Sequence, residues 1–164
     1  MDRELHLRPV LISDLEAVYS ETMSNPFAAR RFGVGLTFKQ YCDALDTTVQ
    51  LHRLLVRNDG DVAGQVLVYA LSVPQRTARL AVDIYASARG LGVWRPAIAL
   101  AVKEVDQFLP IRKLYAHLVI EGDGSACCAI GCQVDGWVVE AVQPNHERYG
   151  GRTFCLVTWA YFNE

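Results

Sequence analysis

The sequence predicts a single mixed α/β domain over residues 1–164, with about seven strands in one central sheet and about four helices. Three observations indicate this class. Asp59-Gly60, a strong hairpin signal, joins two apolar runs of strand period into the start of an antiparallel meander. A helical stripe, Ile98 to Phe108, follows a glycine-containing turn and precedes another strand-like run. The composition, 51% apolar and 21% charged, is typical of a globular domain.

The expected order is β, α, α, β, β, β, α, β, α, β, β. Ser13 with Glu16, and Thr37 with Gln40, predict capping boxes for the two N-terminal helices. The segment between those helices, "SNPFAARRFGVG", reads as a break. The third helix ends before Pro110, and 122–136 holds at most a short fourth helix. The expected strands are 4–10, 51–57, 62–72, 77–85, 113–121, 137–143 and 152–162.

Charge and composition exclude several classes of function. The formal net charge is -2 and the arginines are scattered, which argues against a nucleic-acid partner. No apolar run reaches the roughly 20 residues of a membrane span, so a cytoplasmic protein is expected. The five cysteines have no regular spacing. Free thiols are therefore expected for the cluster Cys127, Cys128 and Cys132, rather than a metal site.

A glycine-containing turn stands between the fourth expected strand and the third helix. Gly90 and Gly92 allow positive φ, and the first amides of the following helix point out of its end. Arg89 adds a positive charge. These features suit a pyrophosphate. An ordinary strand–helix turn has the same pattern, and the P-loop and dinucleotide-binding motifs do not fit the sequence.

The segment Arg89-Gly90-Leu91-Gly92-Val93-Trp94 resembles the Gln/Arg-x-x-Gly-x-Gly/Ala signature of the GNAT acyltransferases, with Trp94 in place of the small final residue. "GCQVDG" (131–136) resembles the "GF-x-x-EG" segment common in the branch that acts on N-terminal amines of ribosomal proteins and on small amines. The resemblance implies a GNAT fold with a splayed fourth and fifth strand. It implies acetyl-CoA as co-substrate, without a metal. It also implies a coenzyme site formed by Ile84, Tyr85, Arg89, Gly90, Leu91, Gly92, Val93, Trp94 and Ser125.

Acyl transfer to an amine needs a base for the amine proton and an acid for the departing thiolate. His117, on the fifth strand where some family members carry a base, is the first candidate. Asp83 follows as a base or an amine clamp, although a pair with Arg79 on the same strand face is also expected. Tyr115 and Cys127 are candidate acids, Cys127 at the place of the family's tyrosine. Each of these side chains also has an ordinary structural interpretation.

The two N-terminal helices, their connection and the last hairpin should form the acceptor site. The candidate residues in those segments are Phe27, Arg30, Arg31, Phe32, Tyr149 and Arg152. The sequence therefore predicts transfer of an acetyl group from acetyl-CoA to a primary amine of a small molecule or protein N-terminus, by direct attack in a ternary complex. The alternatives are an acyl carrier protein as donor, with Arg30, Arg31 and Arg95 meeting its acidic surface, or a non-catalytic GNAT-like module. A homodimer is a further expectation.

Overall fold

The computed structural model describes residues 5–121 and 136–163. Within these residues it has seven strands and four α-helices, which confirms the predicted mixed α/β class. The strands are β1 (Leu5–Pro9), β2 (Val49–Arg57), β3 (Val62–Ser72), β4 (Thr77–Ile84), β5 (Lys113–Glu121), β6 (Trp137–Tyr149) and β7 (Arg152–Phe162). The helices are α1 (Leu15–Ser24), α2 (Pro26–Phe32), α3 (Phe38–Thr48) and α4 (Trp94–Phe108), with 3-10 turns η1 (Ile12–Asp14) and η2 (Ala86–Ala88).

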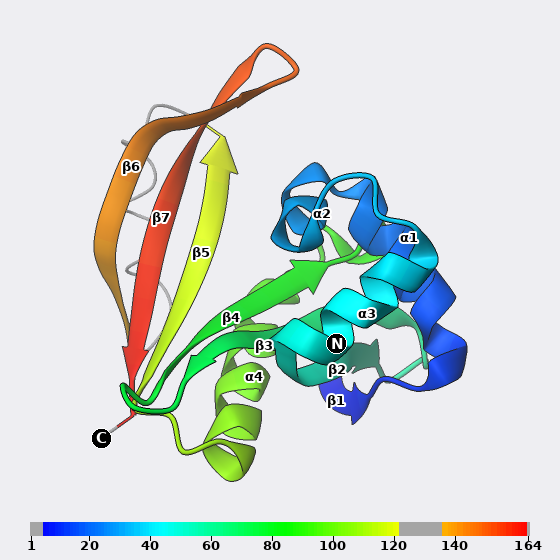
Figure 1. The fold of residues 1–164 in the computed structure, drawn as a ribbon, viewed down its shortest axis with the longest axis horizontal. Coiled ribbons are helices and arrows are strands. Elements are labelled where there is room, and N and C mark those ends of the chain that lie inside the picture. The colour runs from blue at the N-terminus through cyan, green and yellow to red at the C-terminus, as the bar shows by residue number, and fades with distance from the viewer. Residues whose placement is uncertain (1–4, 122–135, 164) are drawn as a thin grey trace. The chain divides into compact units, whose positions relative to one another are not determined.

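The strands hydrogen-bond in the order β1-β2-β3-β4-β5-β7-β6 (Figure 1). The chain divides into two compact units. The first contains residues up to Ala70 together with Ala81–Phe108. The second contains Leu71–Leu80 together with Leu109 onward. A single domain remains a prediction, and each unit is described on its own.

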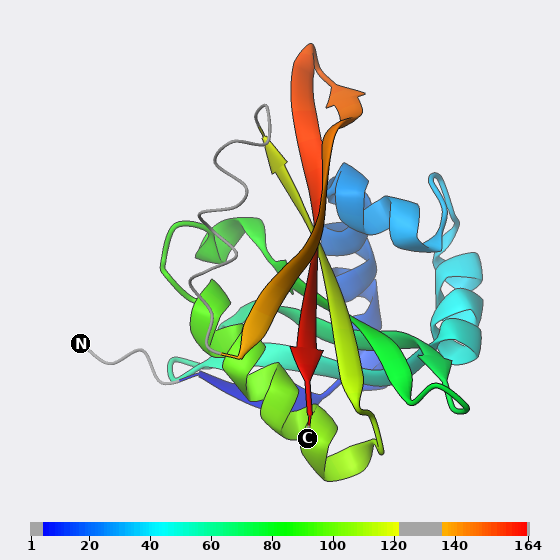
Figure 2. The ribbon, with the colours of Figure 1, turned by 90° about the vertical axis from the view of Figure 1, so that its left-hand side faces the viewer.

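The first unit has a buried cluster on each face of its strands. On one face, Val18 and Leu45 of α1 and α3 pack against Leu54 and Leu67. On the other, Val93 and Ala97 at the start of α4 pack against Leu55 and Ala63. Figure 2 shows α4 on the opposite side of these strands from α1 and α3. Leu54, Leu55 and Val56 follow one another in β2 and are all buried, because neighbouring side chains of a strand point to opposite faces and both faces are covered here.

Helix starts in the first unit confirm one predicted signal and correct another. The Thr37–Gln40 capping box forms, with Gln40 Oε1 accepting from the Thr37 amide at 2.9 Å. The Ser13–Glu16 box is wrong, because Asp14 is the N-cap of α1 and its carboxylate instead accepts from the Leu11 amide and from Arg8.

Helix α2 occupies a segment that the sequence predicts as a break. Its start has ordinary signals, since Asn25 caps the amides of Phe27 and Ala28 and Pro26 takes the first helical position. The predicted break lies at the end of α2, where Gly33 terminates the helix with φ 118°. A helix of seven residues is too short for periodicity to reveal it.

The second unit is built around β5, β7 and β6, with β4 contributing its first half. Residues Thr77–Leu80 of β4 pair in parallel with Lys113–Ala116 of β5, which confirms the predicted crossover. The ladder ends at Leu80–Ala116, and the splaying of the two strands beyond it remains a prediction. Strand β7 pairs antiparallel with both β5 and β6.

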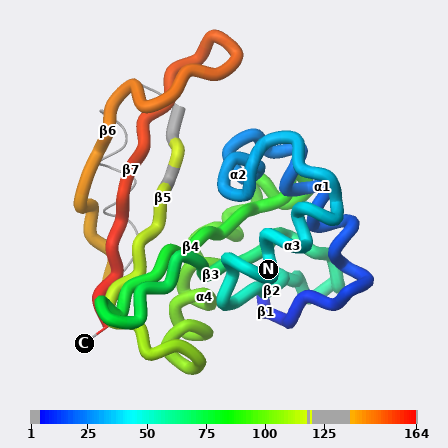
Figure 3. The backbone as a smooth tube through the Cα atoms, in the orientation of Figure 1, coloured from blue at the N-terminus to red at the C-terminus, as the bar shows by residue number. Residues whose placement is uncertain are grey.

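Strand β6 is longer than predicted. The segment "NHERY", expected in a loop, lies in the strand, and only Gly150 and Gly151 form the turn, with φ 56° and 76°. Figure 3 traces this hairpin. Pro144 suggests a strand end, but a register shift between Gln143 and Glu147 accommodates it.

Two further observations concern the cysteines and the helices. Cys155 is fully buried and disulfide-bonded, whereas Cys42 is free, and the cluster Cys127, Cys128 and Cys132 lies outside the described residues. None of the described helices is both long and apolar enough to cross a membrane.

Candidate functional site

The turn before α4 has the geometry that an anion-binding turn requires. Gly90 and Gly92 have φ 75° and 71°, a conformation that residues with side chains rarely adopt. A Cβ at either position would meet no described atom within 4 Å, so the backbone there is open to an approaching group. Arg89 is exposed beside it. The residues present therefore fit a phosphate-bearing ligand.

Trp94 is the first residue of α4 and is half-buried. Its neighbour Val93 is buried against Ala97 and the sheet, and the Val93 carbonyl accepts from the Ala97 amide at 3.0 Å. Pro96 lacks an N–H, so it adds no donor to the first turn. Within the turn, the Leu91 amide donates to Ala88 O at 3.3 Å.

The main chain at the end of β4 limits how a pantetheine arm could bind. The Tyr85 amide donates to Ala63 O at 2.9 Å, and its carbonyl accepts from the Ala88 amide at 3.0 Å. Both main-chain polar groups of Tyr85 thus already have a hydrogen-bond partner. Because neighbouring residues of a strand direct their main-chain groups to opposite edges, Ile84 is the residue of this pair that can bind a ligand there.

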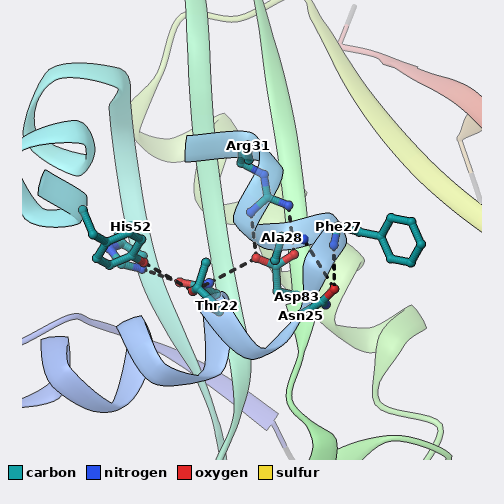
Figure 4. Close-up of polar contacts among 9 residues, drawn as sticks. Thr22, Asn25, Phe27, Ala28, Arg31, His52 and Asp83 are labelled. Carbon is teal, nitrogen blue, oxygen red and sulfur yellow. Dashed lines mark hydrogen bonds and ion pairs between the residues drawn. The ribbon is translucent and has the colours of Figure 1, made fainter. Parts of the chain in front are cut away.

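A largely buried, bidentate ion pair joins α2 to β4. Arg31 donates from both terminal nitrogens to Asp83, at 2.7 and 2.9 Å, and the two side chains are only 15% and 13% exposed. The guanidinium also lies 5.7 Å from the Tyr69 ring centre. The partner of Asp83 is therefore Arg31, rather than Arg79 as the strand spacing indicates. Figure 4 shows the end of the Arg31 side chain directed at the Asp83 carboxylate.

A buried amide extends this ion pair across the sheet. Gln65 Nε2 donates to Asp83 Oδ2 at 3.1 Å and to Thr22 Oγ1 at 2.9 Å. Its Oε1 lies 2.8 Å from His52 Nε2, and burial lowers the pKa of His52. Thr22 Oγ1 is also 3.4 Å from the Tyr41 hydroxyl, whose pKa burial raises to about 12. The chain of contacts runs from His52 through Gln65 to Asp83 and Arg31, with Thr22 as a further partner of Gln65. Figure 4 shows His52, Thr22, Asp83 and Arg31 in this arrangement.

The sequence does not identify Thr22, His52 or Gln65 as site residues. Gln65 stands in the apolar run "VAGQVLVYALS", where a polar side chain on a buried strand is a signal for a hydrogen-bonded partner. The partners themselves lie 13 to 43 residues away, so no local pattern reveals them.

The second unit holds the candidate base and one candidate acid. His117 lies on β5 opposite Thr158 of β7, and its ring is exposed. Partial desolvation, followed by the positive Arg79 and by His146, lowers its pKa, so the imidazole is neutral near pH 7. Tyr115 is half-buried on the same strand, with the Lys113 ammonium 4.5 Å from its ring centre. Lys113 also pairs with Glu140.

The expected acceptor residues divide between the units. In the first unit, α2 carries Phe27, Arg30, Arg31 and Phe32, and of these Arg30 is exposed. In the second, Tyr149 and Arg152 are paired across the tip of the β6–β7 hairpin, and Tyr149 is 52% exposed.

Two candidate residues, Cys127 and Ser125, lie outside the described residues, as does most of the "GCQVDG" segment. Within the described ranges, no three His, Cys, Asp or Glu side chains are grouped as metal ligands.

Comparison with known proteins identifies the fold. No protein-family model matches the sequence, and no curated protein matches it. Solved structures match over nearly the whole chain. Spermidine N-acetyltransferase from Vibrio cholerae, in complex with CoA and spermine, has a TM-score of 0.76 and 16% identity, over 96% of this chain and 95% of that one.

Two other structures agree. Spermidine/spermine N-acetyltransferase of Vibrio cholerae, with manganese, has a TM-score of 0.73 and 19% identity, over 97% of this chain and 92% of that one. A protein assigned as a phosphinothricin N-acetyltransferase has a TM-score of 0.70 and 20% identity, over 98% and 99%. The chain therefore has the GNAT fold of these N-acetyltransferases.

Proposed function

We propose that this protein is a GNAT-type N-acetyltransferase that moves the acetyl group of acetyl-CoA to a primary amine of a small molecule. The observation that supports this most is the turn at Gly90 and Gly92, open at both positive-φ glycines and placed at the start of α4 in this fold. A protein or peptide N-terminus is the other acceptor class, since the "GCQVDG" segment resembles the branch that acts on ribosomal proteins.

In the proposed donor site, the turn amides and Arg89 hold the coenzyme pyrophosphate, and the Ile84 main chain binds the pantetheine arm. Helix-end amides favour negative charge because the peptide dipoles align along the helix. Arg89 is exposed and can reach a phosphate without leaving a buried partner. The ring of Trp94 then has to lie beside the pyrophosphate rather than over it.

The proposed reaction is a direct transfer. The neutral amine nitrogen attacks the thioester carbonyl carbon, an N–C bond forms, the C–S bond breaks, and coenzyme A leaves as a thiolate that takes up a proton. A base must remove one proton from the attacking nitrogen. His117 is the candidate in the described residues, because its lowered pKa leaves it neutral and able to accept a proton at neutral pH.

Asp83 is better suited to positioning than to proton transfer. Both of its oxygens accept from Arg31, and Oδ2 also accepts from Gln65. These three hydrogen bonds occupy both oxygens and fix the direction of the carboxylate toward α2, which suits a positioning role. The same ion pair engages Arg31, one of the three arginines expected to meet a carrier protein. Of these three, Arg30 and Arg95 are exposed.

Calorimetric titration with acetyl-CoA tests the donor site first. Wild type should bind in the micromolar range, and Gly92→Val should bind at least about tenfold more weakly, because a β-branched residue resists φ 71°. Gly60→Val is the matched control. Gly60 has φ 88° and the same open surroundings, but it lies at the tip of the β2–β3 hairpin.

Release of free coenzyme A thiol with a panel of amines tests the reaction. Polyamines, amino-acid analogues and short peptides distinguish the acceptor classes, and His117→Gln should lower kcat by about 100-fold or more while acetyl-CoA still binds. Absence of both acetyl-CoA binding and thiol release by wild type would overturn the proposal. Trp94→Ala shows whether the Trp94 ring blocks the pyrophosphate site. If acetyl-CoA binds to this variant and not to wild type, the ring excludes the coenzyme from wild type.

A further inference from the structure

We propose that Gln65 is a positioning residue that holds helix α2 on the sheet through Asp83 and Arg31, and that it thereby shapes the acceptor side of the active site. The proposal rests on the proposed function for its substrate part. All the residues involved belong to the first unit.

The side chain of Gln65 is completely buried, and each polar atom of its amide has a partner. Nε2 donates one hydrogen to Thr22 at 2.9 Å and the other to Asp83 at 3.1 Å, while Oε1 accepts from His52 at 2.8 Å. An amide has two donor hydrogens, and both are used. Gln65 is therefore fixed from three elements: α1, β2 and β4.

The orientation of this amide follows from Asp83. A flipped amide would turn Oε1 toward the Asp83 carboxylate, and two acceptors would face each other. The unflipped amide places Oε1 against His52, so His52 must carry its proton on Nε2. The burial that lowers the pKa of His52 keeps the ring neutral, with its single hydrogen directed at Gln65. The network thus has one consistent set of donors and acceptors.

Asp83 connects Gln65 to helix α2 through Arg31. It receives Gln65 from one side and the two Arg31 nitrogens from the other. Arg31 is further enclosed by the rings of Tyr69 and Phe32, with centres 5.7 and 5.9 Å from its guanidinium carbon. The position of Asp83 therefore orients Arg31, because a bidentate pair fixes direction as well as distance.

Strand β4 does not need this network to keep its place. The Tyr85 amide bonds to Ala63 O at 2.9 Å, and the backbones of β3 and β4 approach so closely that a Cβ at Gly64 would lie 2.3 Å from Asp83 O. Helix α2 is different, because seven residues have negligible helical stability alone. Loss of Gln65 should therefore release α2 and leave the main chain of Ile84 unmoved.

The functional consequence falls on the acceptor. Helix α2 carries Phe27, Arg30 and Phe32, the expected acceptor-side residues, whereas the donor is proposed to bind at Ile84 and the glycine turn. A change at Gln65 should accordingly raise KM for the amine and leave the affinity for acetyl-CoA unchanged. A role limited to global stability would not separate the two substrates in this way.

The test compares wild type with Gln65→Met, which keeps the shape of the side chain and removes its hydrogen bonds. Hydrogen–deuterium exchange should show the amides of Ala29–Gly33 exchanging about tenfold faster or more, with β4 amides unchanged. KM for the best amine should rise about tenfold, and the Kd for acetyl-CoA should stay within about twofold of wild type. Gln40→Met is the control, since Gln40 also forms hydrogen bonds but only within the start of α3.

Arg31→Lys provides a second variant if Gln65→Met does not fold. It keeps the charge and loses the bidentate geometry, and it should reproduce the faster α2 exchange with unchanged donor affinity. Unchanged exchange of α2 in a folded variant would overturn the positioning role. Faster exchange with unchanged amine KM would overturn its link to the acceptor. Failure of the proposed function is separate, because it appears in wild type as absent acetyl-CoA binding and turnover, whereas the exchange experiment needs no activity.

Discussion

Two arginine–aspartate pairs in the first unit have the same bond lengths and different surroundings. Arg8–Asp14 and Arg31–Asp83 are both bidentate, with 2.7 and 2.9 Å contacts. Arg8 and Asp14 are six residues apart at the edge of the unit, and the Arg8 side chain is 32% exposed. Arg31 and Asp83 are 52 residues apart and are joined to Gln65.

The difference between the pairs shows that geometry alone does not set the contribution of an ion pair. Water solvates an exposed partner when the other is removed, so the loss is small. A partner that is enclosed by rings and strands is left charged in the protein interior without solvation by water, so the loss of stability is large. Four predictions test this difference between the two ion pairs.

The largest expected effect is that of Asp83→Asn. It leaves the enclosed Arg31 without a counter-charge, and the free energy of unfolding should fall by about 3 kcal/mol. Urea denaturation at pH 7, followed by circular dichroism, measures it. A loss no larger than that of Asp14→Asn would remove the basis of the comparison.

Asp14→Asn should cost about 1 kcal/mol at pH 7. Hydrogen bonding from Arg8 lowers the pKa of Asp14 to about 2, against an ordinary value of 3.8. A lowered carboxyl pKa stabilises the fold above the ordinary value, and this stabilisation is lost as the pH falls toward about 2. Unfolding curves of wild type and variant should therefore converge between about pH 4 and pH 2. A difference that persists well below pH 2, where the folded carboxyl is protonated as well, would show a role other than charge.

His52 should make the surroundings of Asp83 sensitive to milder acid. Burial lowers its pKa below the unfolded value of 6.5, so below that pH the unfolded chain binds the extra proton first. Stability should accordingly fall as the pH drops through 6.5, and then level off once the folded state is protonated. His52→Gln should flatten the dependence of the unfolding free energy on pH in this range. His117→Gln removes only the contribution of a separate, exposed histidine. An unchanged profile in His52→Gln would contradict the assignment.

Salt gives the smallest expected effect. Raising NaCl from about 0.1 to 1 M shortens the screening length from about 10 to 3 Å. Double-mutant cycles should show the Arg8–Asp14 coupling falling by a few tenths of a kcal/mol, with a smaller change for Arg31–Asp83. Equal salt dependence would mean that solvent reaches both pairs alike.

Local signals predicted most of the fold. The Thr37–Gln40 box, the Asp59-Gly60 hairpin and the crossover from β4 to β5 depend on neighbouring residues, so the sequence reveals them. The helical stripe of α4 was also correct at Ile98, Ala101 and Val105. It failed at Phe108, which is 58% exposed beneath the Arg53 guanidinium.

The candidate site was less predictable, because its contacts are non-local. The periodicity of β4 places Asp83 with Arg79, yet α2 delivers Arg31 from 52 residues away. Helix α2 itself was missed because seven residues show no clear period. The glycine turn was visible in the sequence because positive φ restricts residue type, and that restriction acts at a single position.

Gly64 has a consequence for the folding of the β3–β4 pair. Its neighbours Val62, Ala63, Gln65 and Val66 all carry side chains. A slip of β4 along β3 by one or two residues would bring one of them to the place where Asp83 O now approaches the backbone, with a Cβ at 2.3 Å. Misaligned pairings are therefore disfavoured by steric overlap, so the missing side chain of Gly64 helps to specify one alignment of the two strands.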